Sequence, residues 1–386
     1  MSNMDNKILS GIFDSHFYDE NHGAEIVLNN KKYLMFGSVN YLGLSHNPGV
    51  IEVAKKALEL YGAGGLGSRA SNGCLKIHKE LDSYLAEFMG KESAISFNSG
   101  YLANLGVISS AIDHKAAIFS DKENHLSIYD ACLLSGVETF RYKHNDYEHL
   151  EFFLKKTPLD REKWIVTVGT FGATGDIVNL SEIHKLAKKY KARIYLDDAH
   201  AIGIYGANRR GLAEQFGVIE DIDLIMGSFQ MAFGNMGAFV AGNSSLIDQV
   251  RFHSRQYIFS YNLPALNVCA LLRSLEIIRS KEGADLVDQL FENVESLRSN
   301  LVRKGLTVLS EKSQIISLLI GDDVLCVEFY KRIFEKGLWT QIYLNPSVPK
   351  DRAIIRLTST AIHSREQIDR AADILISTAK ELRIIK

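Results

Sequence analysis

The sequence has few features of secreted, membrane-spanning or nucleic-acid-binding proteins. Its four cysteines lie far apart, which indicates neither a disulfide framework nor a close metal-binding pair. No apolar run approaches the roughly 20 residues that cross a bilayer, and the opening letters MSNMDNKILSGIFDSHF lack the basic-then-apolar layout of a secretory signal. A formal net charge of −2 argues against binding nucleic acid through bulk electrostatics. We expect a cytoplasmic protein with no membrane span, no nucleic-acid partner and no metal.

Low-complexity linkers, repeats and long charge runs are also missing, and only 5 of the 386 residues are prolines. Between residues 92 and 229, strand-like runs such as ESAISF, AAIFSD, WIVTV and ARIYL alternate with helical patterns. This alternation predicts an α/β fold with a mostly parallel central sheet. Several of the runs are apolar throughout, which indicates that both faces of the sheet are covered.

The pattern changes along the chain in three steps. Residues 1–45 read as an N-terminal arm, with a short hairpin in AEIVLNNKKYLMFG. Residues 46–265 read as a large domain that begins with amphipathic helices over 47–62 and 78–90. A long helical stretch then leads into a mixed region, so we predict a smaller C-terminal α+β domain over residues 266–386.

Gly62, Gly64 and Gly67 satisfy the pattern GxGxxG. Such glycines hold a dinucleotide only between a strand and a helix, where they bring backbone amides to a pyrophosphate. Here a predicted helix precedes the glycines and SRASNG follows them. A flexible, substrate-facing loop is therefore the better interpretation.

Asp197 and Asp198 follow the apolar strand ARIYL, at the strand end where open α/β sheets bind ligands. Consecutive strand residues point to opposite faces, so the two carboxylates should not act as one catalytic dyad. A carboxylate here could keep a heteroaromatic nitrogen protonated while His200 bonds a phenolic oxygen, and a structural strand end explains the residues equally well. A metal site formed by Asp198 and His200 lacks other clustered ligands.

Two further strand ends carry candidate residues. His125 follows AAIFSD and could stack on an aromatic cofactor, although a structural histidine is the simpler interpretation of this residue alone. Gly100 and Tyr101 open a predicted helix, where free amides suit a phosphate. A plain N-cap is the alternative for that segment.

Taken together, these segments resemble the α-oxoamine synthases, a group of fold-type I pyridoxal 5′-phosphate (PLP) enzymes that includes 8-amino-7-oxononanoate synthase and serine palmitoyltransferase. The resemblance covers nearly the whole chain. It rests on these segments, in order: NYLGL (40–44), GSRASNG (67–73), NSGYLAN (98–104), NHLSIYD (124–130), HNDYEHL (144–150), TGDIVNL (174–180), LDDAHAIGIYG (196–206), GSFQMAFGNMGAFVAG (227–242), FSYNLP (259–264), SQII (313–316) and IRLTSTAIHS (355–364).

The resemblance implies a role for each matching residue. His125 would stack on the PLP ring, Asp197 would bind its ring nitrogen and His200 its ring hydroxyl. Further cofactor-binding residues would hold the phosphate: Gly100, Tyr101, Ser228 and, from a partner subunit, Ser260. Asn40 and Arg356 would bind the carboxylate of an amino-acid substrate.

Three positions depart from the family pattern. Asp198 replaces a glutamate, and Gly172 replaces a serine near the ring. At the position of the family lysine the chain has Met231, and no lysine occurs between Lys191 and Lys281. That lysine forms the covalent link to PLP and moves the substrate's α-proton, and a thioether can do neither. We expect PLP to bind non-covalently or as an external aldimine, with very poor turnover.

The implied activity is a PLP-dependent acyltransferase, a homodimer that condenses an amino acid with an acyl-CoA or other acyl thioester. Three explanations of Met231 remain open: an introduced Lys→Met change, a natural lysine-free non-catalytic or regulatory subunit, and lysine-independent chemistry in which His125 or a water moves protons. An aminotransferase on the same fold is a further alternative.

Overall fold

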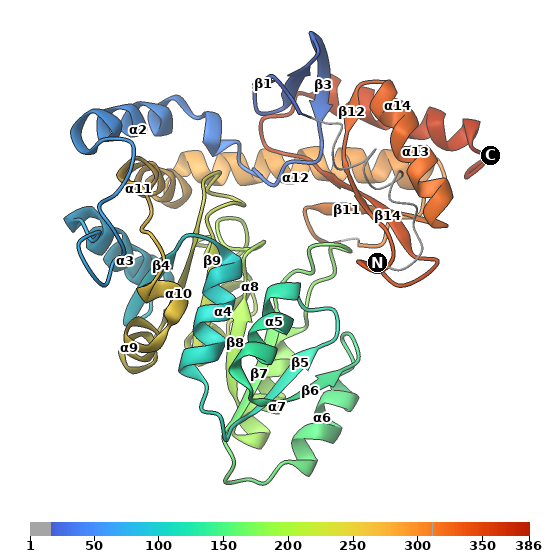
Figure 1. Ribbon diagram of the computed structural model, residues 1–386. Helices are drawn as coiled ribbons and strands as arrows, with labels where there is room; N and C mark the ends of the chain where they lie inside the picture. Colours follow the sequence, from blue (N-terminus) through green and yellow to red (C-terminus); the bar gives the residue numbers. More distant parts are fainter. Residues whose placement is uncertain (1–16, 311) are drawn as a thin grey trace. The chain divides into compact units, whose positions relative to one another are not determined.

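The computed structural model describes residues 17–310 and 312–386, which form two compact units (Figure 1). One unit comprises Asn47–Phe171 and Ile177–Gly283 and is called the sheet unit below. The other, called the terminal unit, comprises residues 17–46, 172–176 and 284–386. The part of the predicted N-terminal arm before residue 17 lies outside the described residues, and the predicted boundaries at residues 45 and 265 stay predictions.

A seven-stranded sheet forms the core of the sheet unit, with strand order β4-β10-β9-β8-β7-β5-β6. All neighbouring strands are parallel except β10, which runs antiparallel to both β4 and β9. The prediction of a mostly parallel sheet is confirmed. The strands are β4 (Ser93–Phe97), β5 (Ala117–Asp121), β6 (Glu138–Tyr142), β7 (Lys163–Val168), β8 (Arg193–Asp197), β9 (Leu224–Ser228) and β10 (Ala238–Gly242).

Several helices of the sheet unit begin at a residue whose side chain caps them. Asn47 caps the helix that Pro48 opens, and Gly62 ends it. Ser99 caps α4, which packs against α5 (Figure 1). The helices are α2 (Pro48–Tyr61), α3 (Lys76–Met89), α4 (Gly100–Ala111), α5 (Leu126–Ser135), α6 (Tyr147–Lys156), α7 (Leu180–Tyr190), α8 (Leu212–Gln215), α9 (Ser244–His253), α10 (Arg255–Ile258) and α11 (Ala265–Arg279), with a 3-10 turn at Ile219–Asp221.

The terminal unit contains two small sheets. In the first, β2 and β3 form the predicted hairpin, and Asn29 and Asn30 take positive φ angles of 50° and 61° at its two-residue turn. The strands are β1 (Glu20–Asn21), β2 (Glu25–Leu28), β3 (Lys31–Met35) and β12 (Leu338–Trp339) in one sheet, and β11 (Ile315–Gly321), β14 (Ala353–Thr358) and β13 (Gln341–Tyr343) in the other. The helices are α12 (Lys281–Arg303, which starts at the end of the sheet unit), α13 (Asp323–Glu335) and α14 (Arg365–Glu381), with a 3-10 turn at Leu44–His46.

Two serine side chains hold the short segment 172–176 within the terminal unit. The Ser310 hydroxyl donates to the Gly175 carbonyl at 2.7 Å, and the Ser317 hydroxyl donates to the Ala173 carbonyl at 2.6 Å. Gly172, the position of the expected serine, belongs to this segment. Over the described residues, no helix combines the length and apolar character of a membrane span.

Candidate active site

The sheet brings most of the predicted site segments to one edge. In parallel strands the carboxyl ends meet at the same edge, and Asp197 at the end of β8 lies opposite Val168 of β7 and Met226 of β9. Although β10 is reversed, Ala238 pairs with both Phe97 at the end of β4 and Ser228 at the end of β9. The segments after β4, β5, β8 and β9, which carry all the predicted cofactor residues except Ser260, therefore share this edge.

The Asp197 carboxylate is buried at this edge and accepts two hydrogen bonds. The Asn104 side-chain amide donates to one of its oxygens at 2.9 Å, and the Ala199 backbone amide donates to the other at 3.2 Å. Burial raises the pKa of Asp197, while the Asn104 amide and the nearby His125 oppose that rise. Because two hydrogen bonds fix its position, the Asp197 carboxylate can bind a cationic ring nitrogen.

His125 is the N-cap residue of α5. Its Nδ1 lies 2.7 Å from the Ser127 hydroxyl and accepts the Ser127 backbone amide at 3.3 Å. The Tyr101 ring approaches it edge-on, with 6.5 Å between the ring centroids and an interplanar angle of 80°. Both bonds reach Nδ1, so they restrain the imidazole from one side.

A phosphate would find donors at the start of α4. Gly100 and Tyr101 are the first two residues of the helix, so their amides have no carbonyl partner within it. Ser99 satisfies only the Leu102 amide, at 3.2 Å. The buried Ser228 hydroxyl is two strands away along the same edge and accepts the Gln230 amide at 3.2 Å. Free amides at a helix N-terminus and a nearby hydroxyl fit a phosphate.

Met231 lies in the turn that follows β9, half-buried, where its carbonyl accepts the Gly234 amide at 3.3 Å. Its side chain ends in a methyl thioether, which offers neither an amine nor a transferable proton. The residues at this edge therefore fit the phosphate and the ring nitrogen of PLP, but they do not supply the amine that would link it.

Asp198 and His200 complete the predicted segment. Asp198 is fully buried and accepts the Leu212 backbone amide at 2.7 Å, so the two neighbouring carboxylates have different partners. Burial raises the pKa of Asp198 to about 7. His200 is half-buried, two residues beyond Asp198. Within the described ranges, no three His, Cys, Asp or Glu side chains gather as metal ligands would.

The loop with GSRASNG is anchored at Arg69, and the flexibility expected of the glycines before Arg69 stays a prediction. Arg69 and Asp82 form a buried ion pair with guanidinium nitrogens 2.6 and 3.2 Å from the carboxylate oxygens. The side chains are 4% and 9% exposed. As expected, the glycines before this loop follow a helix and do not lie between a strand and a helix. Ser260 is half-buried beside Tyr261, which forms an isolated bridge with Ser68 of the loop.

The two predicted substrate residues belong to the terminal unit. Arg356 is 4% exposed, and its guanidinium donates to Gln341 at 3.0 Å, to the Tyr343 hydroxyl at 3.1 Å and to the Tyr41 hydroxyl at 3.3 Å. Over residues 17–310 and 312–386, no carboxylate forms an ion pair with Arg356, whose partners are all uncharged. The Asn40 amide donates to the Ser45 hydroxyl at 2.7 Å.

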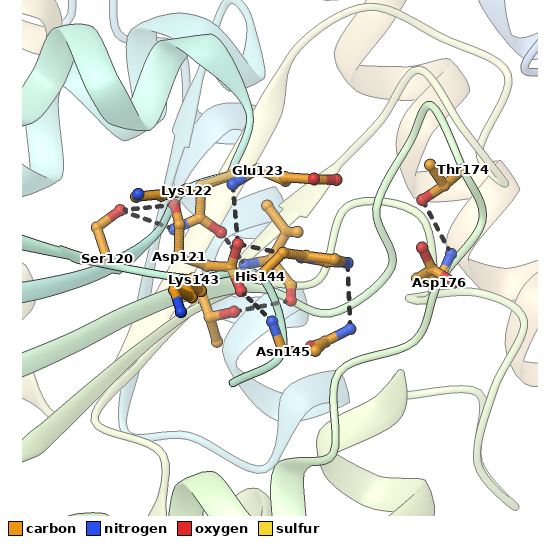
Figure 2. A network of polar contacts seen from close by, with 12 residues as sticks. Ser120, Asp121, Lys122, Glu123, Lys143, His144, Asn145, Thr174 and Asp176 are labelled. Carbon is orange, nitrogen blue, oxygen red and sulfur yellow. Dashed lines mark hydrogen bonds and ion pairs between the residues drawn. The ribbon is translucent and has the colours of Figure 1, made fainter. Parts of the chain in front are cut away.

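Sequence reasoning missed the polar network around Asp121 (Figure 2). The Asp121 carboxylate accepts the Glu123 amide at 2.8 Å, the His144 Nδ1 at 3.1 Å and the Asn145 amide at 2.9 Å. These bonds join the loops after β5 and β6, and the loop after β5 carries His125. The signal was available in the sequence, because NHLSIYD and HNDYEHL both follow strand ends with polar residues.

Comparison with known proteins gives consistent matches. Residues 31–375 match the family Aminotransferase class I and II. The chain is 39% identical to a serine palmitoyltransferase of Bacteriovorax stolpii over 94% of this chain and 86% of the relative. It is 36% identical to an 8-amino-7-oxononanoate synthase of Thermoanaerobacter pseudethanolicus over 94% and 92% of the two chains.

A solved serine palmitoyltransferase with PLP internal aldimine superposes with a TM-score of 0.95 at 30% identity, covering 98% of this chain and 96% of the other. The family resemblance, the fold class and the dependence of the family on PLP are thus confirmed. The chain belongs to the α-oxoamine synthases, within the class I and II aminotransferase fold.

Proposed function

We propose that this chain is an α-oxoamine synthase that binds PLP and an amino acid but is disabled for condensation with an acyl thioester by Met231. The observation that carries the proposal is the buried Asp197 carboxylate at the carboxyl edge of the sheet, held by Asn104 and Ala199. An ionised carboxylate at this place keeps a pyridine nitrogen protonated. When bound, PLP supplies an electron sink that stabilises negative charge at the substrate α-carbon.

The other residues have complementary roles in this proposal. The amides of Gly100 and Tyr101 and the Ser228 hydroxyl bind the phosphate, and the His125 ring covers one face of the pyridine. His200 binds the ring hydroxyl, and Ser260 of a second copy of the chain reaches the phosphate.

Arg356 supports the amino-acid half of the proposal. A guanidinium out of water is strongly disfavoured unless an anion balances it. Gln341 and the two tyrosines orient this guanidinium without neutralising it. A substrate carboxylate, with Asn40 as a second donor, provides the missing charge and accepts bidentate hydrogen bonds.

Met231 sets the limit of the activity. In the family a lysine amine binds the cofactor covalently and carries the α-proton. The methionine is apolar and similar in length, so the pocket keeps its shape without an amine. We therefore propose that this chain holds PLP without a covalent bond to the protein and condenses substrates very slowly.

The test is Met231→Lys, with Met236→Lys as a matched control. Met236 lies five residues further on and is 43% exposed. Each protein is incubated with PLP, reduced with borohydride, digested and analysed by mass spectrometry, and is assayed for carbon dioxide and free thiol released from an amino acid and an acyl-CoA. We expect a cofactor adduct at position 231 and condensation activity in Met231→Lys alone. Absence of the adduct at position 231 refutes a competent PLP pocket.

A supporting, non-catalytic subunit is the second candidate, favoured by Met231, which leaves the chain without the family lysine. Both candidates need a second subunit, and the chain has an exposed apolar stripe on α5. Leu126, Tyr129 and Leu133 share one face of this helix and are 62%, 39% and 64% exposed. We propose that a second copy of this cytoplasmic chain covers the stripe in a homodimer. Sedimentation velocity distinguishes the dimer from the monomer, and Leu133→Glu should shift the distribution to monomer. An adduct without condensation activity in Met231→Lys would favour the supporting role.

A further inference from the structure

Asn104 is a buried side chain that the family comparison gives no role, and it lies on the same helix as the proposed phosphate donors. It is 1% exposed, in α4, three and four residues after Tyr101 and Gly100. Its amide has three partners: the Asp197 carboxylate at 2.9 Å, the Ser127 hydroxyl at 2.8 Å and the Tyr195 hydroxyl at 2.6 Å. Asn104 therefore connects three elements beneath the proposed ring site.

The directions of these hydrogen bonds follow from the chemistry of the partners. An ionised Asp197 can only accept, so the NH2 group of Asn104 faces it and the Asn104 carbonyl oxygen faces Tyr195. Tyr195 must then donate its hydroxyl hydrogen to that oxygen. The second NH2 hydrogen of Asn104 goes to the Ser127 oxygen, which leaves the Ser127 hydrogen free to donate elsewhere.

His125 is the acceptor of that hydrogen. The Ser127 backbone amide, which can only donate, also points at His125 Nδ1. Both donors require a lone pair on Nδ1, so the imidazole proton resides on Nε2. A single direction of donation thus runs from Tyr195 through Asn104 and Ser127 to His125, with a branch from Asn104 to Asp197.

We propose that Asn104 is a positioning residue that sets two proton locations at once: it keeps Asp197 ionised, and through Ser127 it keeps His125 in the Nε2–H tautomer. The cofactor part rests on the proposed function, in which Asp197 contacts the ring nitrogen and His125 stacks on one face of the same ring. The tautomer part concerns this chain alone. It can be measured without PLP.

The experiment compares Asn104→Asp and Ser127→Ala with a matched change, Asn293→Asp. Asn293 is a buried asparagine of the terminal unit whose NH2 group donates to two backbone carbonyls, at 3.0 and 2.9 Å. The intact chain is labelled with 15N-histidine, and ring shifts are recorded at alkaline pH, where imidazole is neutral. Because the chain has 12 histidines, His125→Gln assigns the signals.

We expect the unmodified chain and Asn293→Asp to show an unprotonated Nδ1 and a protonated Nε2 at His125. Ser127→Ala removes the closer donor to Nδ1, at 2.7 Å, and leaves only the longer bond from the residue 127 backbone amide, at 3.3 Å. Part of the His125 population should therefore shift to the Nδ1–H tautomer. Asn104→Asp should give the same mixture, because the new carboxylate takes the Ser127 hydrogen. An unchanged His125 tautomer in both variants would refute control of this tautomer by Asn104 through Ser127. A Nδ1–H tautomer in the unmodified chain would refute it directly.

PLP binding provides the second measurement, by quenching of intrinsic fluorescence. Asn104→Asp should weaken PLP binding about tenfold or more, since it removes a charge-assisted hydrogen bond to Asp197 and places a second carboxylate beside it. Ser127→Ala should bind PLP within about threefold of the unmodified chain, because Asp197 keeps its donor. Equal PLP affinity in Asn104→Asp and the unmodified chain refutes the Asp197 branch. If the unmodified chain itself fails to bind PLP, the proposed function falls, while the tautomer result stands on its own. If Asn104→Asp does not fold, Ser127→Ala alone decides the His125 branch.

Discussion

The buried pair of Arg69 and Asp82 gives the sharpest stability prediction for this chain. Asp82 accepts two bonds from Arg69, at 2.6 and 3.2 Å, and two from Ser96, at 3.1 Å from its amide and 2.8 Å from its hydroxyl. Replacement of Arg69 by Met leaves the Asp82 carboxylate out of water with only the Ser96 donors. Removing one partner of a buried ion pair typically destabilises a protein by about 3–5 kcal/mol.

The double variant Arg69→Met/Asp82→Leu separates the charge from the packing. It leaves no buried charge, so the loss should fall to about 1–2 kcal/mol, mainly from the Ser96 amide and hydroxyl that lose their acceptor. The exposed pair of Lys76 and Glu80 on the same helix is the control, with side chains 90% and 48% exposed. Lys76→Met should change stability by less than about 0.5 kcal/mol.

The assay is urea unfolding followed by circular dichroism, with the four proteins in the same buffer. A loss below about 1 kcal/mol in Arg69→Met, or a double variant less stable than Arg69→Met, would contradict the buried-pair reasoning. A large effect would also show that the GSRASNG loop is fixed to α3 and β4 before any ligand binds.

Three further predictions address other residues. Arg356→Met should weaken amino-acid binding at least tenfold, measured by calorimetry in the presence of PLP, which is about the effect of a lost charge-assisted hydrogen bond. The urea midpoint of unfolding should stay the same or rise, because the variant removes a buried charge without a counter-charge. A clear loss of stability would refute the idea that the Arg356 charge is uncompensated. Burial lowers the pKa of His363 to about 4, so the folded state resists a proton that the unfolded state takes up at its ordinary pKa of about 6.5. The His363 contribution to the free energy of unfolding is fully present above about pH 6.5 and declines toward pH 4, by up to about 3 kcal/mol. His363→Gln should flatten this part of the curve of unfolding free energy against pH. Gly73→Ala should lower the stability by about 2 kcal/mol in thermal melts, because the new Cβ would lie 1.9 Å from the Gly67 carbonyl oxygen. Gly64→Ala is the control and should be nearly neutral in the same assay, because no atom lies within 4 Å of its new Cβ.

Sequence patterns predicted the sheet and the hairpin because each depends on short-range information. Runs of apolar residues alternating with helices specify parallel strands, and the pair Asn29 and Asn30 suits the left-handed turn of a two-residue hairpin. The reversed strand β10 could not be recognised, because its apolar run has no signature of direction. Its pairing with both β4 and β9 is a long-range property.

The candidate site shows the same division. Strand ends located Asp197 and His125, since ligands bind at the carboxyl edge of such sheets. The sequence did not reveal Asn104 as a partner of Asp197, because the two residues are 93 positions apart and Asn104 resembles any other asparagine in an apolar helix. The ion pair of Arg69 was missed for a related reason, because a loop rich in glycine and serine indicates flexibility and the partner Asp82 is 13 residues away on a helix.

Two buried charges of this chain can bind ligands without the family lysine. Asp197 is buried in one unit and Arg356 in the other, and neither has an oppositely charged side chain bonded to it among the described residues. Each desolvated charge lowers the stability of the empty protein. A ligand that neutralises either charge must therefore stabilise the folded chain through its binding free energy. This linkage requires no chemistry and no lysine, so PLP and an amino acid should each raise the melting temperature of the unmodified chain. Under the proposed function, we therefore expect a higher melting temperature with each ligand and very slow condensation.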